Sequence, residues 1–537
     1  MPIANPQPAA AKIRNPVEKR MAQLHDLWWE QTAHPHLRAI VLRAPAQSQR
    51  MIEAFFTLQH VDSEYSTPDL FIRFDHAFEA GFSYSRELRR SLVETYEYNK
   101  AQFASQGVTA PWIEAEQAGF DSAAGFMETA YSLARHLNRQ ITSIVLQPRH
   151  ISSRELFDQW FDDAMQVHVP PKDAGLLRLV LLDDDENRAW QPLAERHAAH
   201  ITIVQAPVSL LDTANEIAAQ SGGGDSAQVL YRQMYMDMFT LLQHGNAAAV
   251  ERKAVGAMQL ATRQGWIDQR VAVDMVVGGA WLKARDFSRS IERYRAARAS
   301  AQESVTVGSP AGRMMVVQTW MAEGGAWFAS GDMKQSALAF EEAAKAAKEV
   351  PHAMLAIEGY RAAAQSWHRH GERDKAVETA LLGVQEARHM PDADRPASTV
   401  PLLLNDLLRL YDSTRWERII QCGADYEKQL LQAQTDADRA TRRLGAHPQS
   451  QAVEAIEERL LQAYEQAFQA LLIAREQLVK HGSKTFQTVV ALGRQWLHPA
   501  WSGLPDARHP LDLDPDEWSS APEFAVLPDP QSMLEAD

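Results

Sequence analysis

Short, unbroken runs of aliphatic residues recur through the N-terminal part of the chain. They are rich in Val, Ile and Leu, and most begin or end at a Pro, a Gly or a turn residue. Strands buried on both faces of a sheet have this pattern, because neither face alternates with polar residues. We therefore expect strands within residues 37–44, 69–78, 141–148, 176–184 and 200–207.

Between these runs the apolar residues recur at helical spacing, for example in residues 85–107 and 152–167. The second of these begins with "SSRE", which predicts a capping box from Ser152 to Glu155. An alternation of strands and helices predicts an α/β domain with a mostly parallel sheet over residues 1–220.

The pattern changes after a run of three glycines, and we expect a glycine-rich linker at residues 221–228. Residues 229–390 show only helical periods, and they repeat. Candidate turns lie at Gly245, Arg285, Gly331 and Gly371, with spacings of 40, 46 and 40 residues. Small or aromatic residues recur nine and twelve positions after each turn. Repeats of this length predict stacked helical hairpins, that is, an all-α solenoid.

The stretch "ASGDMKQSALAFEEAAKAA" resembles the second half of a tetratricopeptide repeat, with Gly331, Ala337, Phe340 and Ala343 on the family pattern. The resemblance covers residues 226–390. It departs from the usual 34-residue period of the family, and Arg285 replaces one turn glycine. The resemblance implies that the first helix of each hairpin lines a groove that binds a peptide or another protein.

The last part of the chain begins with long amphipathic helices at residues 391–483. Their broad apolar faces favour a cap over the end of the solenoid, and pairing with another chain into a homo-oligomer is the alternative. Residues 484–537 predict a terminal helix and then an acidic, proline-rich tail. Trp501, Trp518 and Phe524 lie in this tail and are expected to dock on the body or on a partner.

Composition narrows the class of protein. The net charge of −15 argues against nucleic acid and anionic membranes as partners. The single cysteine, Cys422, rules out a disulfide framework and favours a reducing compartment. No run of apolar residues is long enough to span a membrane, and the N-terminal residues lack the apolar core of a secretory signal. We expect a bacterial cytoplasmic protein.

The stretch "LLRLVLLDDDE", residues 176–186, is similar to the Walker B strand of a P-loop NTPase. Phosphate binding in that family also needs a glycine-rich loop that ends in Gly-Lys, and the chain has no such pair. The turn after the first strand contains Pro45, which lacks a backbone N–H, and no glycine. We therefore expect a P-loop-NTPase-like sheet without a P-loop, no cofactor and no NTPase activity.

The sequence gives weaker support to a hydrolase site, a metal site or a nucleophilic cysteine. Asp75, Asp183 and Asp185 are candidates for a hydrolase site only if they converge at one edge of the sheet. His197 and His200 favour surface histidines over metal ligands, and Cys422 favours core packing over a nucleophile. We expect no catalytic residue and no metal site.

The leading hypothesis is a non-enzymatic adaptor or chaperone that binds a protein or peptide through the repeats. Lys283, Gln318, Trp320 and Arg361 are the candidate partner-binding residues. In its overall sequence character the chain also resembles repeat-containing accessory proteins of bacterial type VI secretion. This resemblance implies a secreted effector as partner. The alternative is an atypical NTPase-type signalling protein whose repeats act as sensors.

Overall fold

The computed structural model divides the chain into two compact units. The first comprises Met1–Gln220 and Leu430–Ala463, and the second comprises Ser221–Gln429 and Tyr464–Asp537. The structure describes residues 15–61, 63–67, 69–105, 107–108, 110–112, 120–137, 141–210, 212–213, 216–217, 226–243, 245–350, 352–512, 527–530 and 533. Residues 221–225 of the predicted linker therefore lie outside the described residues, and Ser226 already begins a helix.

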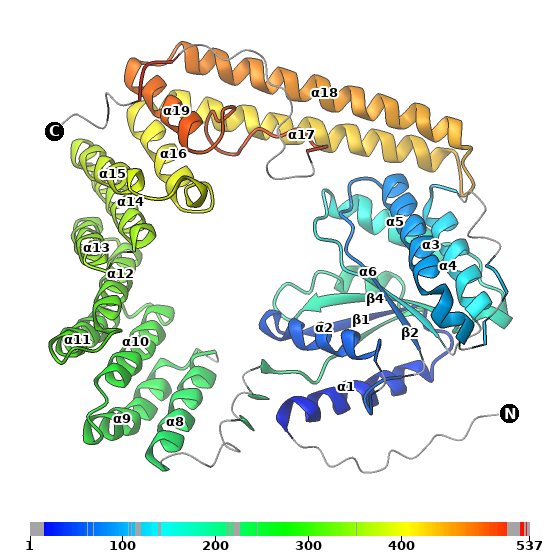
Figure 1. Ribbon diagram of the computed structural model, residues 1–537, viewed down its shortest axis with the longest axis horizontal. Coiled ribbons are helices and arrows are strands. Elements are labelled where there is room, and N and C mark those ends of the chain that lie inside the picture. The colour runs from blue at the N-terminus through cyan, green and yellow to red at the C-terminus, as the bar shows by residue number, and fades with distance from the viewer. Residues whose placement is uncertain are drawn as a thin grey trace. The chain divides into compact units, whose positions relative to one another are not determined.

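A five-stranded parallel sheet forms the centre of the first unit, as predicted (Figure 1). Its spatial order is β2-β3-β4-β1-β5, and register pairs such as Ile40 with Val180 align the two central strands. The five predicted runs all contain a strand. The strands are β1 (Ala39–Ala44), β2 (Leu70–Phe74), β3 (Thr142–Leu146), β4 (Leu177–Asp184) and β5 (Ile201–Gln205).

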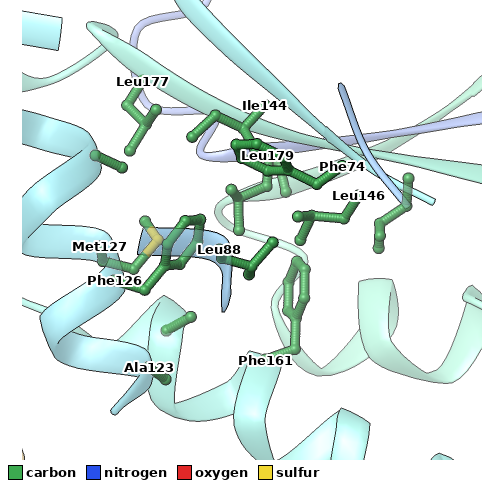
Figure 2. Close-up of a cluster of buried hydrophobic side chains, with 14 of the residues drawn as sticks. Phe74, Leu88, Ala123, Phe126, Met127, Ile144, Leu146, Phe161, Leu177 and Leu179 are labelled. Atoms are coloured by element: carbon green, nitrogen blue, oxygen red, sulfur yellow. The ribbon is translucent and has the colours of Figure 1, made fainter. Parts of the chain in front are cut away.

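Helices cover both faces of this sheet. Alternate residues of β4 illustrate the arrangement: Leu179 packs into one apolar cluster and Val180 into another. The cluster around Leu179 is drawn in Figure 2, where Phe126 and Phe161 from the covering helices meet the sheet. Burial on both faces explains why the central strands β3, β4 and β1 are mostly apolar. One face is covered by α1 (Pro16–Thr32) and α2 (Gln49–Leu58), and the other by α3 (Gly81–Ser105), α4 (Ala123–Leu137), α5 (Arg154–Gln166) and α6 (Gln191–Arg196).

Two local features of the first unit differ from the sequence pattern. Helix α5 is capped by Ser153, which accepts a hydrogen bond from the Leu156 N–H, so the predicted cap at Ser152 was wrong by one residue. Arg178 lies in the apolar strand β4 yet is fully buried. Its guanidinium donates to the carbonyls of Gln31, Thr32 and His34 at the end of α1, where a helix leaves its last carbonyls without partners.

Helical hairpins form the N-terminal part of the second unit, and they confirm the predicted solenoid (Figure 1). The four predicted turn residues join the two helices of each hairpin, and each has a positive φ: 71° at Gly245, 60° at Arg285, 92° at Gly331 and 94° at Gly371. The helices are α8 (Ser226–Gln243), α9 (Ala247–Arg263), α10 (Ile267–Lys283), α11 (Phe287–Thr306), α12 (Gly312–Ser330), α13 (Met333–Lys348), α14 (Ala353–His370) and α15 (Arg373–Arg388).

Close packing inside the hairpins depends on glycine. A Cβ atom on Gly278 of α10 would lie 2.5 Å from the Tyr294 ring of α11. A Cβ atom on Gly324 of α12 would likewise lie 2.7 Å from the Phe340 ring of α13. Both aromatic residues stand nine positions after a turn, so this recurring position in the sequence is where the second helix packs on the first.

The C-terminal helices are α16 (Val400–Tyr411), α17 (Ser413–Arg443), α18 (Ser450–Lys480) and α19 (Lys484–Trp496). In the second unit α16, α19 and the end of α18 share an apolar cluster with α14 and α15, and thereby cover the last hairpin. Trp501 is buried in the same cluster, directly against Gly493, whereas Trp518 and Phe524 lie outside the described residues. Residues 430–463, the facing ends of α17 and α18, belong to the first unit. Within the described part of the chain, no helix is long and apolar enough to cross a membrane.

Candidate functional site

The carboxyl edge of the sheet is one candidate ligand site in the first unit. In open parallel sheets, ligands bind where neighbouring strands send their connections in opposite directions. Here that point lies between β1 and β4. Arg43 fills it: its Nε and Nη2 atoms donate to Oδ2 of Asp183 at 3.0 and 2.8 Å, and Nη2 also donates to Gln191 at 2.9 Å. The acidic end of the stretch at residues 176–186 is thus bound by the protein's own arginine.

The three acids proposed for a hydrolase site have separate partners. Asp75 binds Arg149 at 2.6 Å, in an exposed ion pair at the end of β2. Asp185 accepts a hydrogen bond from Gln205 at 2.9 Å, at the end of β5. Asp183 is buried and bound to Arg43 as described above. Because β3 separates β2 from β4, these carboxylates do not form one cluster.

The histidines and the cysteine have structural surroundings. His197 Nε2 lies 2.7 Å from Asp162 on α5. Among the described residues, no group of three or more His, Cys, Asp or Glu side chains is close enough to hold a metal ion. Cys422 is half-buried on α17, and burial raises the pKa of its thiol. A raised pKa disfavours the nucleophilic thiolate.

Three of the four predicted partner-binding residues share one face of the first helices. Gln318 on α12 is exposed and lies two helical turns before Gly325. Gly279 on α10 is the equivalent of Gly325 in the preceding repeat, and Lys283 lies one turn after it. Arg361 occupies the same face on α14. We call this surface the first-helix face, and we define it by Met275, Gly279, Lys283, Gln318, Met321, Gly325, Phe328 and Arg361.

The charged members of this face already have partners in the chain. Lys283 Nζ donates to the carbonyls of Leu242 and Gln243 at 3.2 Å, at the end of α8. The Arg361 guanidinium donates to both carboxylate oxygens of Glu358, at 2.7 and 2.8 Å, and to Asp406 at 3.2 Å. The hydrogen bonds that Arg361 donates to Glu358 raise the pKa of Arg361. These two side chains are therefore held in place before any partner arrives.

Trp320 lies on a different side of α12, together with Glu323 and Trp327. The Arg298 guanidinium from α11 stacks 3.5 Å from the centre of the Trp320 ring. Arg298 and Arg295 both bind the buried carboxylate of Glu323, which also accepts a hydrogen bond from Trp327. Trp320 is thus part of a network between neighbouring hairpins, and the structure does not bring it together with the other three residues.

Sequence reasoning missed a repeated motif on the first-helix face. "GGAW" occurs at residues 278–281 and again at 324–327, at the same position relative to the turn. The first glycine of each pair makes room for Tyr294 or Phe340. The second glycine does not: among the residues that the structure describes, a Cβ atom on Gly325 would meet nothing within 4 Å, and one on Gly279 would meet only the Tyr294 hydroxyl, at 3.8 Å.

These second glycines stand beside large, adaptable side chains. Met275 and Met321 pack against apolar clusters between the helices and remain partly exposed. The Arg369 guanidinium lies 4.5 Å from the centre of the Phe328 ring. Methionine is common on surfaces that bind varied apolar partners. A comparison with protein-family models finds no match for this chain, and no curated protein matches it.

Proposed function

We propose that this chain is a non-enzymatic adaptor or chaperone that binds an apolar peptide segment of another protein on the first-helix face. The observation that carries the proposal is the open space in front of Gly325. A glycine inside a helix costs about 1 kcal/mol relative to alanine. No contact within the described chain requires that glycine, so close approach by a partner is the remaining physical reason for it.

The neighbouring side chains support a peptide as the partner. Met321 and Phe328 flank Gly325 at helical spacing and offer apolar contact. Lys283 and Arg361 lie further along the same face and are already held in fixed positions, which lowers the entropic cost of using them in binding. The resemblance to type VI accessory proteins makes a secreted bacterial effector the first partner to test.

The experiment compares three forms of the full chain as bait in the source cell: wild type, Gly325→Leu and Gln335→Leu. Gly325→Leu extends a side chain into the open space in front of Gly325, where a Cβ atom has no neighbour within 4 Å among the described residues. Gln335→Leu adds the same side chain to an exposed position on α13, a second helix, and serves as the matched control. We expect wild type and control to capture the same protein, and Gly325→Leu to bind it at least tenfold more weakly by calorimetry.

Two results would contradict the adaptor proposal. One is a wild-type chain that reproducibly captures no protein. The other is equal affinity of Gly325→Leu and wild type for the captured protein, since that would place the binding surface elsewhere.

The alternative, an NTPase-type signalling protein, depends on the sheet edge. The Arg43–Asp183 pair occupies the point between β1 and β4, and Pro45 removes a backbone donor from the turn that follows β1. Both features weigh against nucleotide binding there. Calorimetry with ATP or GTP and Mg²⁺ tests this alternative: binding heat that is lost in Asp183→Asn would favour it over the adaptor.

A further inference from the structure

The first unit contains a cavity of about 650 Å³, separate from the sheet edge and from the repeats. It lies between the beginnings of α3 and α4, the end of α5, and the end of α17 with the residues that follow it. The end of α17 and the beginning of α18 form a tip that belongs to the same unit. A cavity of this size is within the range of small-molecule sites. Its lining includes Phe82, Ala124, Trp160, Asp163, Asp438 and Arg442.

Asp438 of α17 is the central polar group of the cavity. Its side chain is buried, with 3% of the residue exposed. Its Oδ1 atom accepts a hydrogen bond of 2.9 Å from the N–H of Gly81, the first residue of α3. A Cβ atom on Gly81 would lie 2.7 Å from this oxygen, so the glycine makes room for the carboxylate. A carboxylate is favoured at this position by the dipole of the long helix α3.

Capping α3 accounts for only one oxygen of Asp438. The other oxygen, Oδ2, accepts no hydrogen bond from the residues that the structure describes, and because it is not closed off from solvent it remains open to a ligand in the cavity that Asp438 lines. The neighbouring Arg442 does not donate to Asp438 but to both carboxylate oxygens of Asp163, at 2.8 and 3.0 Å. Burial raises the pKa of Asp438. A carboxylate oxygen that accepts no hydrogen bond from the protein is open to a donor, and a cationic N–H group is its strongest complement.

Two aromatic residues line the same cavity. Trp160 is held in place because its Nε1 donates to Ser85 at 2.9 Å, and its Cδ1 lies beside Gly81. Phe82 follows Gly81 directly on α3. Aromatic faces attract ammonium groups and pack against apolar carbon, so they complement a carboxylate in a site for an amine.

We propose that this cavity binds a small organic molecule with a protonated primary amine. Its ammonium group donates to Oδ2 of Asp438, and its carbon skeleton lies along Phe82 and Trp160. Because Asp438 comes from α17, binding requires the tip of α17 and α18 to be docked on α3 and α5. That docking is mostly polar, with Arg86–Glu457 at 2.9 Å and Arg442–Asp163 at 2.8 Å, so an amine in the cavity stabilises the docked tip.

The test uses the full chain and two probes of the same shape. Phenethylamine carries the ammonium group, and 2-phenylethanol replaces it with a hydroxyl. We expect phenethylamine to bind in calorimetry and to slow hydrogen exchange in residues 430–463, and 2-phenylethanol to bind at least tenfold more weakly. The proposal fails if neither probe binds at millimolar concentration, or if both bind equally.

Three variants assign the binding to this site. Asp438→Asn keeps an oxygen for the Gly81 N–H but removes the charge, and we expect at least a tenfold loss of phenethylamine affinity. Ala124→Trp fills the cavity and leaves Asp438 unchanged, so it should lose binding even if the first variant docks poorly. Asp436→Asn alters an exposed carboxylate on the same helix and should bind like wild type. Unchanged affinity in both Asp438→Asn and Ala124→Trp would overturn the proposal.

Discussion

The second repeat (α10 and α11) and the third repeat (α12 and α13) are built on the same contacts. Each has "GGAW" in its first helix, and an aromatic ring from its second helix packs on the first glycine of that motif. In each, a serine of the second helix donates to the carbonyl of that glycine: Ser290 to Gly278 at 2.9 Å and Ser336 to Gly324 at 3.0 Å. These few positions fix how closely the two helices approach.

The two repeats differ one residue before the motif. The second has Val277 there, and the third has Glu323, which is 2% exposed and is bound by Arg295, Arg298 and Trp327. Trp281, the equivalent of Trp327, has no hydrogen-bond partner for its Nε1 among the described residues. The hairpin geometry therefore tolerates either an apolar or an ionic interior, provided that the glycine contact remains.

The largest expected effect comes from Glu323→Val, which installs the residue of the second repeat in the third. Arg298 would lose its carboxylate while its side chain is only 13% exposed, and Trp327 would lose its acceptor. Breaking a buried ion pair costs about 3 kcal/mol or more. We expect that loss in the free energy of unfolding, measured by urea denaturation.

The double variant Glu323→Val with Arg298→Leu tests the reason for that loss. Without the buried arginine, most of the stability should return, since apolar replacement of both partners is often neutral. If Glu323→Val alone is as stable as wild type, the ionic network does not support the third repeat, and the two repeats are energetically alike.

The two glycines of the third repeat should respond to alanine with opposite signs. In Gly324→Ala the new Cβ would lie within 3 Å of the Phe340 ring, and overpacking of this kind costs about 1–3 kcal/mol. In Gly325→Ala the methyl group enters open space, so the helix gains up to about 1 kcal/mol. Thermal unfolding of both variants measures the difference. Destabilisation of similar size in both would mean that Gly325 also has a packing role, which would remove the observation behind the proposed function.

Much of this fold was predictable because its signals are local. The three central strands β3, β4 and β1 are mostly buried on both faces, and all five strands lie in short runs rich in Val, Ile and Leu. The turns need a left-handed residue, and spacing alone identified even Arg285. The sequence does not distinguish the two possible caps of α5, since Ser152 and Ser153 are adjacent and only the path of the chain selects one. Arg178 had no signal at all, because the carbonyls that it binds lie at the end of α1 and just after it, about 145 residues earlier in the chain.

The sites were predictable only in part, because they also depend on contacts between residues that are far apart in the sequence. Helical spacing is enough to place Lys283, Gln318 and Arg361 on one face. It does not say which face of α12 the preceding hairpin covers, so Trp320 was grouped with them although Arg298 stacks on it. The cavity beside Asp438 was out of reach of any local pattern, because Asp438 and Gly81 are 357 residues apart in sequence.

The smallest expected effect returns to the turns of the same two repeats. Arg285 in the second repeat has φ 60°, where the third repeat has Gly331 at φ 92°. A left-handed conformation costs a residue with a Cβ atom about 1 kcal/mol, so Arg285→Gly should raise the free energy of unfolding by up to that amount, and Gly331→Arg should lower it similarly. The gain is limited because glycine also adds freedom to the unfolded chain. Urea denaturation of both variants provides the measurement. A loss of stability in Arg285→Gly would show that the arginine side chain contributes more than its backbone strain costs, and that the two turns are not equivalent.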